Sequence, residues 1–152
     1  MPMRLFISYS HEDKAVAEKL ISELDEYHDC WIDSDDIRAG ADWKRSIDWA
    51  IARSDVFLFL ASWQSIRSEQ CQREVELALR LRRRIIPLVL EDRILMRPEL
   101  SALQWIFLEN FDEGVRSLLG ELRPLHNYWQ LLALVEMLII ISMSTWIGLR
   151  IS

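Results

Sequence analysis

The chain has 152 residues, of which 51% are hydrophobic and 28% are charged. This length fits one ordinary domain, and the balance of apolar and charged residues excludes disordered, collagen-like and low-complexity proteins. The formal net charge of -6 disfavours a general nucleic-acid binder, which needs a basic surface. The two cysteines, Cys30 and Cys71, cannot make a disulfide framework, so a reducing cytosolic setting is expected.

Short apolar runs alternate with helical patterns over the first 121 residues. The expected strands are Arg4–Ser8, Cys30–Ile32, Val56–Leu60, Ile85–Leu90 and Trp105–Leu108. Apolar residues recur at helical spacing between them, in Val16–Leu24, Trp43–Ile51 and Glu69–Arg83. Strands that alternate with helices of this length predict an α/β fold, in which helices cover both faces of a parallel sheet.

Charged residues become rare beyond residue 123, where only Glu136 and Arg150 remain. The segment Tyr128–Leu149 is apolar on every side, which is typical of a buried or membrane helix and not of a surface helix. At ~1.5 Å per residue it is long enough to cross a ~30 Å hydrocarbon core. Trp129 and Trp146 stand near its ends, where interfacial aromatic residues gather.

Glu136 weighs against insertion, because a carboxylate near the bilayer centre costs ~2.5–3.5 kcal/mol. The aliphatic residues around it each favour insertion by roughly 0.3–0.6 kcal/mol, and their sum is larger. We therefore predict a globular domain at residues 1–123 and a single transmembrane helix at 124–152, with the domain on the cytoplasmic side. In that case Glu136 is expected to contact a second protomer. A dimerisation helix, or a helix packed on the domain, is the alternative.

The chemistry of such a fold is expected at one edge of the sheet, because ligands bind outside the carboxyl ends of parallel strands. Three segments stand there: Ser8–Ser10, the loop Asp33–Gly40, and Ser62–Glu74. Glycine-rich dinucleotide and phosphate-binding motifs are absent from the sequence. The three histidines are scattered among unrelated elements, so no metal site is expected: His11, His28 and His126.

Charged residues of the third predicted helix have two interpretations. By spacing alone, Glu74 is a boundary residue between Cys71 and Ala78 at the edge of the buried stripe. A basic cluster ends the helix and comprises Arg80, Arg82, Arg83 and Arg84. These arginines interact favourably with the helix dipole or, as an alternative, contact anionic headgroups beside a membrane anchor.

Three motifs carry a family resemblance. They are FISYSHED at Phe6–Asp13, DSDDIRAGADW at Asp33–Trp43, and FLFLASWQSIRSEQCQREVELA at Phe57–Ala78, followed by IIPLVL. In this order and with these spacings, from about Leu5 to Glu121, the chain resembles a Toll/interleukin receptor (TIR) domain, in a style similar to bacterial members. The resemblance implies a flavodoxin-like three-layer fold with a central parallel sheet of about five strands.

The resemblance also implies one of two functions. Some TIR domains are adaptors that assemble through the loop that corresponds to Asp33–Gly40. Others cleave NAD+ at the nicotinamide–ribose bond with one glutamate on the third helix, and Glu74 stands at that position. Ser62, Ser68 and Cys71 fit the stretch that precedes this glutamate in the family.

A single carboxylate suits this reaction. Nicotinamide leaves the positively charged nucleotide as a neutral molecule, so no general acid is needed, unlike in ordinary glycoside hydrolysis. One anion in a dry cleft can stabilise the oxocarbenium-like charge that develops. The chain departs from the family at Gln70, where a tryptophan is common and could pack on the nucleotide.

The resemblance further implies which residues bind the substrate. Ser8 and Tyr9 in the first loop, Trp43 beside the second, and Ser68 with Cys71 near Glu74 are the candidates. Three of them also have a structural interpretation, because Ser68 can cap the third helix and Trp43 and Cys71 can belong to the core.

The expected function is therefore that of an NAD+ hydrolase, which depletes NAD+ or forms a cyclic ADP-ribose product in defence signalling. Activation is expected through self-association of the TIR domain and the terminal helix, with NAD+ as substrate and no further cofactor. The alternative is a catalytically silent adaptor that recruits other TIR proteins at a membrane. A third interpretation is a bacterial effector that mimics host adaptors.

Overall fold

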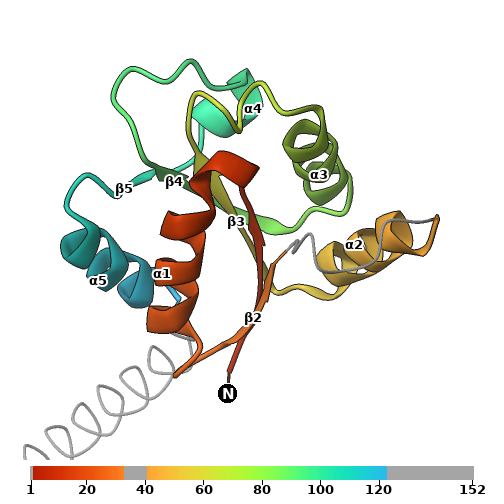
Figure 1. Ribbon diagram of the computed structural model, residues 1–152, viewed down its shortest axis with the longest axis horizontal. Coiled ribbons are helices and arrows are strands. Elements are labelled where there is room, and N and C mark those ends of the chain that lie inside the picture. Colours follow the sequence, from red (N-terminus) through yellow and green to blue (C-terminus); the bar gives the residue numbers. More distant parts are fainter. Residues whose placement is uncertain (1, 33–40, 123–152) are drawn as a thin grey trace, which may run out of the picture. The chain divides into compact units, whose positions relative to one another are not determined.

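Five parallel strands form the centre of the fold in the computed structural model, which describes residues 2–32 and 41–122 (Figure 1). The strands are β1 (Arg4–Ser8), β2 (Asp29–Ile32), β3 (Val56–Ala61), β4 (Arg84–Val89) and β5 (Ile106–Phe107). Their order in the sheet is β2-β1-β3-β4-β5, and every neighbouring pair is parallel. This is the flavodoxin-like order, so the predicted sheet is confirmed, with a shorter fifth strand than expected.

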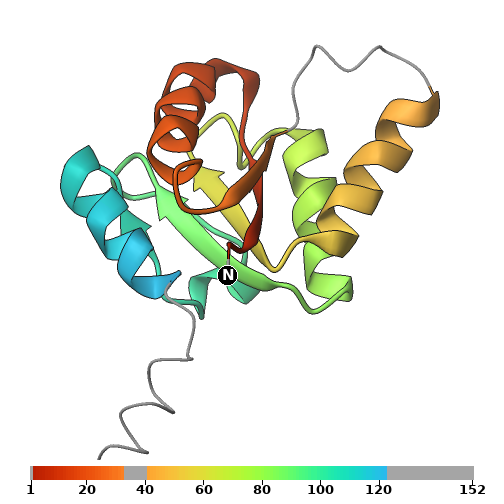
Figure 2. The ribbon, with the colours of Figure 1, turned by 90° about the horizontal axis from the view of Figure 1, so that it is seen from below.

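Helices cover both faces of the sheet, as predicted. They are the 3-10 helix η1 (His11–Asp13) and the α-helices α1 (Lys14–Leu24), α2 (Ala41–Arg53), α3 (Glu69–Arg80), α4 (Pro98–Ser101) and α5 (Phe111–Glu121). Helices α1 and α5 pack on one face, and α2 and α3 pack on the other (Figure 2).

The alternation of side chains along the strands separates two apolar layers. Leu5 and Leu58 face α1 and α5, whereas Phe6 and Phe57 face α2 and α3 and stack with ring centroids 5.4 Å apart. All six residues of β3 are buried, because this central strand has a helix layer on each side.

Helix α3 is shorter than its sequence pattern predicts. It ends at Arg80, with Leu81 as the C-cap, and the backbone at Arg82 takes a left-handed conformation with φ 53°. The predicted inward residues Val75 and Ala78 are buried, whereas Leu79 is only half-buried.

Two predicted features lie outside the described residues: the loop Asp33–Gly40, and the apolar helix predicted at 124–152 with Glu136. Both stay predictions. Among the helices of residues 2–32 and 41–122, none has the length and apolar character needed to cross a bilayer.

Candidate functional site

Two loops at the carboxyl edge of the sheet enclose a cavity of about 430 Å³. One loop follows β1 and the other joins β3 to α3, so the segments are far apart in sequence but adjacent in space. The cavity is lined by Tyr9, Ser10, His11, Glu12, Gln64, Arg67, Ser68 and Gln70. Its volume lies in the range of small-molecule sites, about 300–1,000 Å³.

One hydrogen bond joins these two loops, and others fix the loop that follows β3. The buried Ser62 hydroxyl, at the end of β3, donates to Asp13 Oδ2 at 2.5 Å. The backbone N–H groups of Ser62 and Ser65 each donate to the other residue's hydroxyl, and Trp63 N donates to Glu91 Oε2 at 3.0 Å. Burial raises the pKa of Asp13, the hydrogen bond from Ser62 opposes that rise, and the nearby charge of Glu91 adds to it. These hydrogen bonds fix the backbone on both sides of Gln64, which lines the cavity.

Glu74 is an ionisable residue at a core position of α3, and its exposed fraction is only 1%. It stands one helical turn after Gln70, and Gln70 Nε2 donates to Glu74 Oε1 at 3.2 Å. Glu74 is not among the residues that line the cavity, but Gln70 is. Gln70 therefore connects the cavity with the buried carboxylate behind it.

Cys71 lies among three of the other predicted site residues. Burial raises the pKa of its thiol to about 11, the hydroxyls of Ser68 and Ser8 oppose that rise, and the charge of Glu74 adds to it. The thiol is therefore protonated at neutral pH. Ser68 is the N-cap of α3, since its hydroxyl accepts a hydrogen bond from Cys71 N at 3.3 Å.

The structure brings most of the predicted site residues to one place. Tyr9 and Ser68 line the cavity, and Ser8 and Cys71 are buried beside it. Within the part of the chain that the structure describes, Ser8 Oγ has no oxygen or nitrogen partner. Trp43 is not among the residues that line the cavity: it lies in the first turn of α2, half-buried against the apolar layer under α2 and α3 that also contains Cys71.

Sequence reasoning missed four residues of the cavity wall, His11, Glu12, Gln64 and Arg67. The Ser10 hydroxyl contacts the Glu12 carboxylate and lowers its pKa, so Glu12 is an anion in the wall. Arg67 places its guanidinium 5.7 Å from the centre of the Trp63 ring. Gln64 and Arg67 stand in Ser62–Glu74, which the sequence assigned to the carboxyl edge, whereas His11 and Glu12 directly follow the assigned segment Ser8–Ser10.

Comparisons with known proteins agree with this architecture. A family model described as TIR domain matches residues 5–119. The TIR domain of the Toll-related receptor TRR-2 from Hydra magnipapillata superposes with a TM-score of 0.68 and 20% identity, over 80% of this chain and 99% of that one.

A second similar structure is the CMP N-glycosidase BcmB from Clostridium botulinum, with a TM-score of 0.62 and 19% identity, over 78% of this chain and 99% of that one. At these identities the likeness is one of fold. A search of curated proteins found no match.

Proposed function

The chain belongs to the TIR domain family, and from that premise we propose that it is an enzyme that cleaves NAD+ at the bond between nicotinamide and ribose. The observation that carries the proposal is Glu74, a buried carboxylate on α3 that is bonded to a residue of the cavity wall. Burying an ionisable group is costly, so such a group beside a cavity is a candidate for chemistry.

In the proposed reaction the bond between ribose C1′ and the nicotinamide nitrogen breaks, and nicotinamide leaves with the electron pair as a neutral molecule. Positive charge develops on the ribosyl group, and the Glu74 carboxylate stabilises it from a site with little water. A water molecule then adds to C1′ and loses a proton, which gives ADP-ribose. If an adenine nitrogen adds in place of water, the product is cyclic ADP-ribose.

The other site residues have supporting roles in this proposal. Gln70 orients one oxygen of Glu74, and the Ser8 hydroxyl, with no oxygen or nitrogen partner among the described residues, can donate to a ribose oxygen. Tyr9 and Ser68 line the cavity and contact the nucleotide there. Cys71 packs behind the carboxylate, and Trp43 contributes to the core under α2.

The structural neighbour BcmB supports the proposed class of reaction, which is cleavage of a bond between ribose and a base nitrogen. Its name describes an N-glycosidase that acts on CMP, so it cleaves a bond between ribose and a base nitrogen. Cleavage of NAD+ at nicotinamide belongs to the same class.

A silent adaptor is the second candidate, and two features favour it. Glu74 stands behind the cavity wall, and Gln70 occupies the position where the family commonly has a tryptophan. In either case we propose self-association through the TIR domain and the terminal helix, at a membrane with the domain on its cytoplasmic side, in defence signalling of the bacterial type.

Nicotinamide release from NAD+ by the full chain, reconstituted in membranes at high density, tests the proposal. Glu74→Gln keeps the shape of the side chain and is expected to lower release on the order of 10²- to 10³-fold. The matched control is Glu76→Gln, an exposed residue of the same helix that pairs with Arg97 and should keep full activity. Release that survives Glu74→Gln means that another group is catalytic, and a wild-type chain without release favours the adaptor.

A further inference from the structure

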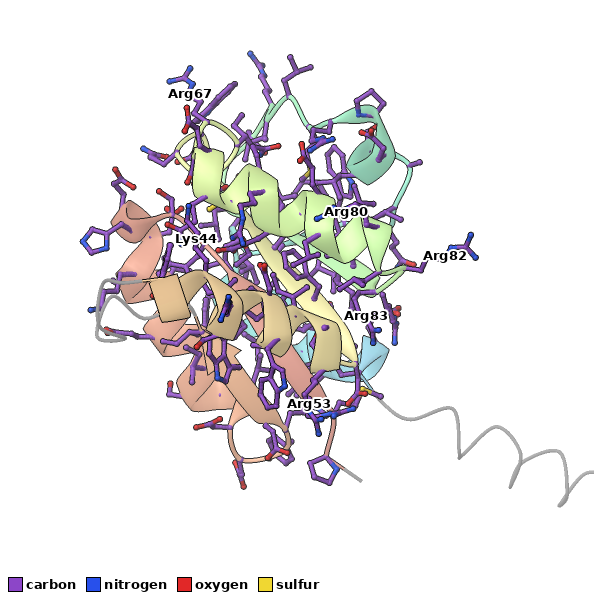
Figure 3. All side chains as sticks on the ribbon, turned by 90° about the vertical axis from the view of Figure 1, so that its right-hand side faces the viewer. Lys44, Arg53, Arg67, Arg80, Arg82 and Arg83 are labelled. Atoms are coloured by element: carbon purple, nitrogen blue, oxygen red, sulfur yellow. The ribbon has the colours of Figure 1, made fainter. Side chains whose placement is uncertain are left out.

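Four arginines stand together at the amino-terminal edge of the sheet, opposite the cavity. This arginine edge consists of Arg53, Arg80, Arg82 and Arg83 (Figure 3). Parallel β3 and β4 begin side by side at this edge, with Val56 opposite Arg84, so the residues that precede the two strands are neighbours. Arg83 Nη1 donates to the carbonyl oxygen of Ser54 at 3.1 Å, which joins the ends of α2 and α3.

The charge of the arginine edge is not neutralised within the domain. Among the described residues, none of its four members forms an ion pair. The nearby acids already have other partners: Asp55 pairs with Arg4 at 2.9 Å, and Glu121 pairs with Arg84 at 3.0 Å. The hydrogen bond from Arg4 is the main cause that lowers the pKa of Asp55, and the charge of Arg83 is a smaller cause. A chain with a net charge of -6 therefore keeps a positive edge.

The helix dipole explains only part of this arrangement. Arg53 and Arg80 occupy the last turns of α2 and α3, where a cation is favourable. Arg82 lies beyond the helix in a left-handed conformation that glycine or asparagine usually takes, and its side chain points away from the domain (Figure 3). An arginine here presents charge to solvent at a conformational cost.

An exposed aromatic residue lies beside these charges. The Arg53 guanidinium lies 4.8 Å from the centre of the Trp49 ring, and Trp49 is 61% exposed. A tryptophan beside an arginine suits the headgroup region of a bilayer. The indole ring can face the apolar layer there while the guanidinium stays in water.

The same edge also holds the end of α5. Arg84 Nη1 donates to the carbonyl oxygen of Glu121 at 3.1 Å, so the last residues of α5 lie beside the start of β4. The sequence then continues into the apolar segment 128–149. The arginine edge and the end of α5 therefore share one end of the domain, and the cavity occupies the other.

We propose that the arginine edge lies on the surface of an anionic bilayer, where its guanidinium groups contact lipid phosphate and carboxylate groups. Basic residues next to an anionic surface are attracted to it within about a Debye length, roughly 10 Å. The cavity would then face the aqueous phase, which leaves it open to a soluble nucleotide. The inference does not depend on the reaction proposed for Glu74.

Hydrogen exchange of the full chain with two kinds of vesicle tests this inference, one of phosphatidylcholine alone and one with added phosphatidylserine. The anionic vesicles are expected to protect the amides of 53–55 and 80–84. In Arg53→Gln/Arg80→Gln/Arg82→Gln, the vesicle concentration for half-maximal protection should rise on the order of 100-fold. Arg83 is left in place because it bonds to Ser54.

The matched control is Lys14→Gln/Lys19→Gln/Arg116→Gln, which removes the same charge from α1 and α5 and should leave protection unchanged. Equal protection by neutral vesicles, or an equal loss in the control, overturns the inference. The inference is also overturned if inorganic phosphate or RNA protects the arginine edge while anionic vesicles do not protect it. A salt series on the wild-type chain provides a test without substitutions, because protection by anionic vesicles must fall as salt rises.

Discussion

Gln70 Nε2 lies 3.2 Å from Glu74 Oε1, and the Gln70 side chain also forms part of the cavity wall. One amide thus contacts both the space where a nucleotide would bind and a carboxylate that is almost wholly buried. Whatever enters the cavity meets Gln70 before it meets Glu74.

Replacing Gln70 with alanine should therefore affect both stability and activity. Removing a hydrogen bond to a buried carboxylate should lower the free energy of unfolding by roughly 1–3 kcal/mol. Nicotinamide release should also fall, because one oxygen of Glu74 is no longer held. Urea denaturation and the release assay measure the two effects, with Gln72→Ala as the control on the same helix. An unchanged stability would mean that this hydrogen bond contributes nothing.

Asp13 should make stability fall as pH rises. Its pKa is raised in the folded protein, chiefly by burial, so the folded state binds the proton more tightly than the unfolded state. The stability that this gives is fully present below the unfolded pKa, near 3.8, and is lost as pH rises through the folded pKa.

Asp13→Asn should consequently gain stability over the wild type at neutral pH, and the gain should disappear in acid. Asparagine Oδ1 can still accept the hydrogen bond from Ser62. Urea denaturation at a series of pH values measures the difference, and a gain that is independent of pH would contradict this account.

Two glycines of α5 should respond to alanine with opposite signs. A Cβ atom on Gly114 would lie 2.5 Å from Leu108 Cδ2 and 2.6 Å from the Phe107 carbonyl oxygen, so Gly114→Ala should destabilise the fold by roughly 1–3 kcal/mol. At Gly120 a Cβ meets nothing within 4 Å, so Gly120→Ala should stabilise by about 0.5–1 kcal/mol through helix propensity. Thermal unfolding of both variants gives the comparison, and equal shifts would show that α5 packs differently.

Both cysteines should be slow to react in the native protein. Burial raises the thiol pKa to about 11 at Cys71 and to about 12 at Cys30, from a usual value of 9.0. The reactive thiolate of Cys71 is then on the order of 100-fold scarcer than in an exposed thiol. Alkylation by iodoacetamide, followed by mass spectrometry with and without urea, measures the protection. Rapid alkylation of Cys71 in the native state would mean that the α3 layer opens.

Periodicity predicted the five strands and the helices α1, α2 and α3, because each is a local pattern of apolar residues, but it did not predict α4 or α5. It placed the end of α3 at Arg83, three residues too late, because the left-handed turn at Arg82 has no glycine to mark it. It also gave Glu74 as a boundary residue, whereas the packing of α2 against α3 and the sheet buries it. The sequence around a glutamate does not show how deeply other elements will bury its side chain.

The sequence by itself determined the order of the five strands and of α1, α2 and α3 along the chain, because these depend on local spacing. It also indicated the carboxyl edge as the place for a site, and the matching family motifs indicated Glu74 as the candidate acid. Only the tertiary structure decided that Arg67 and His11 share a cavity, that Ser62 holds Asp13, and that Arg83 bonds to Ser54. These pairs join segments that are distant in the chain. Their contacts follow from the parallel strand order, which brings loops with no mutual sequence pattern to the same edge of the sheet.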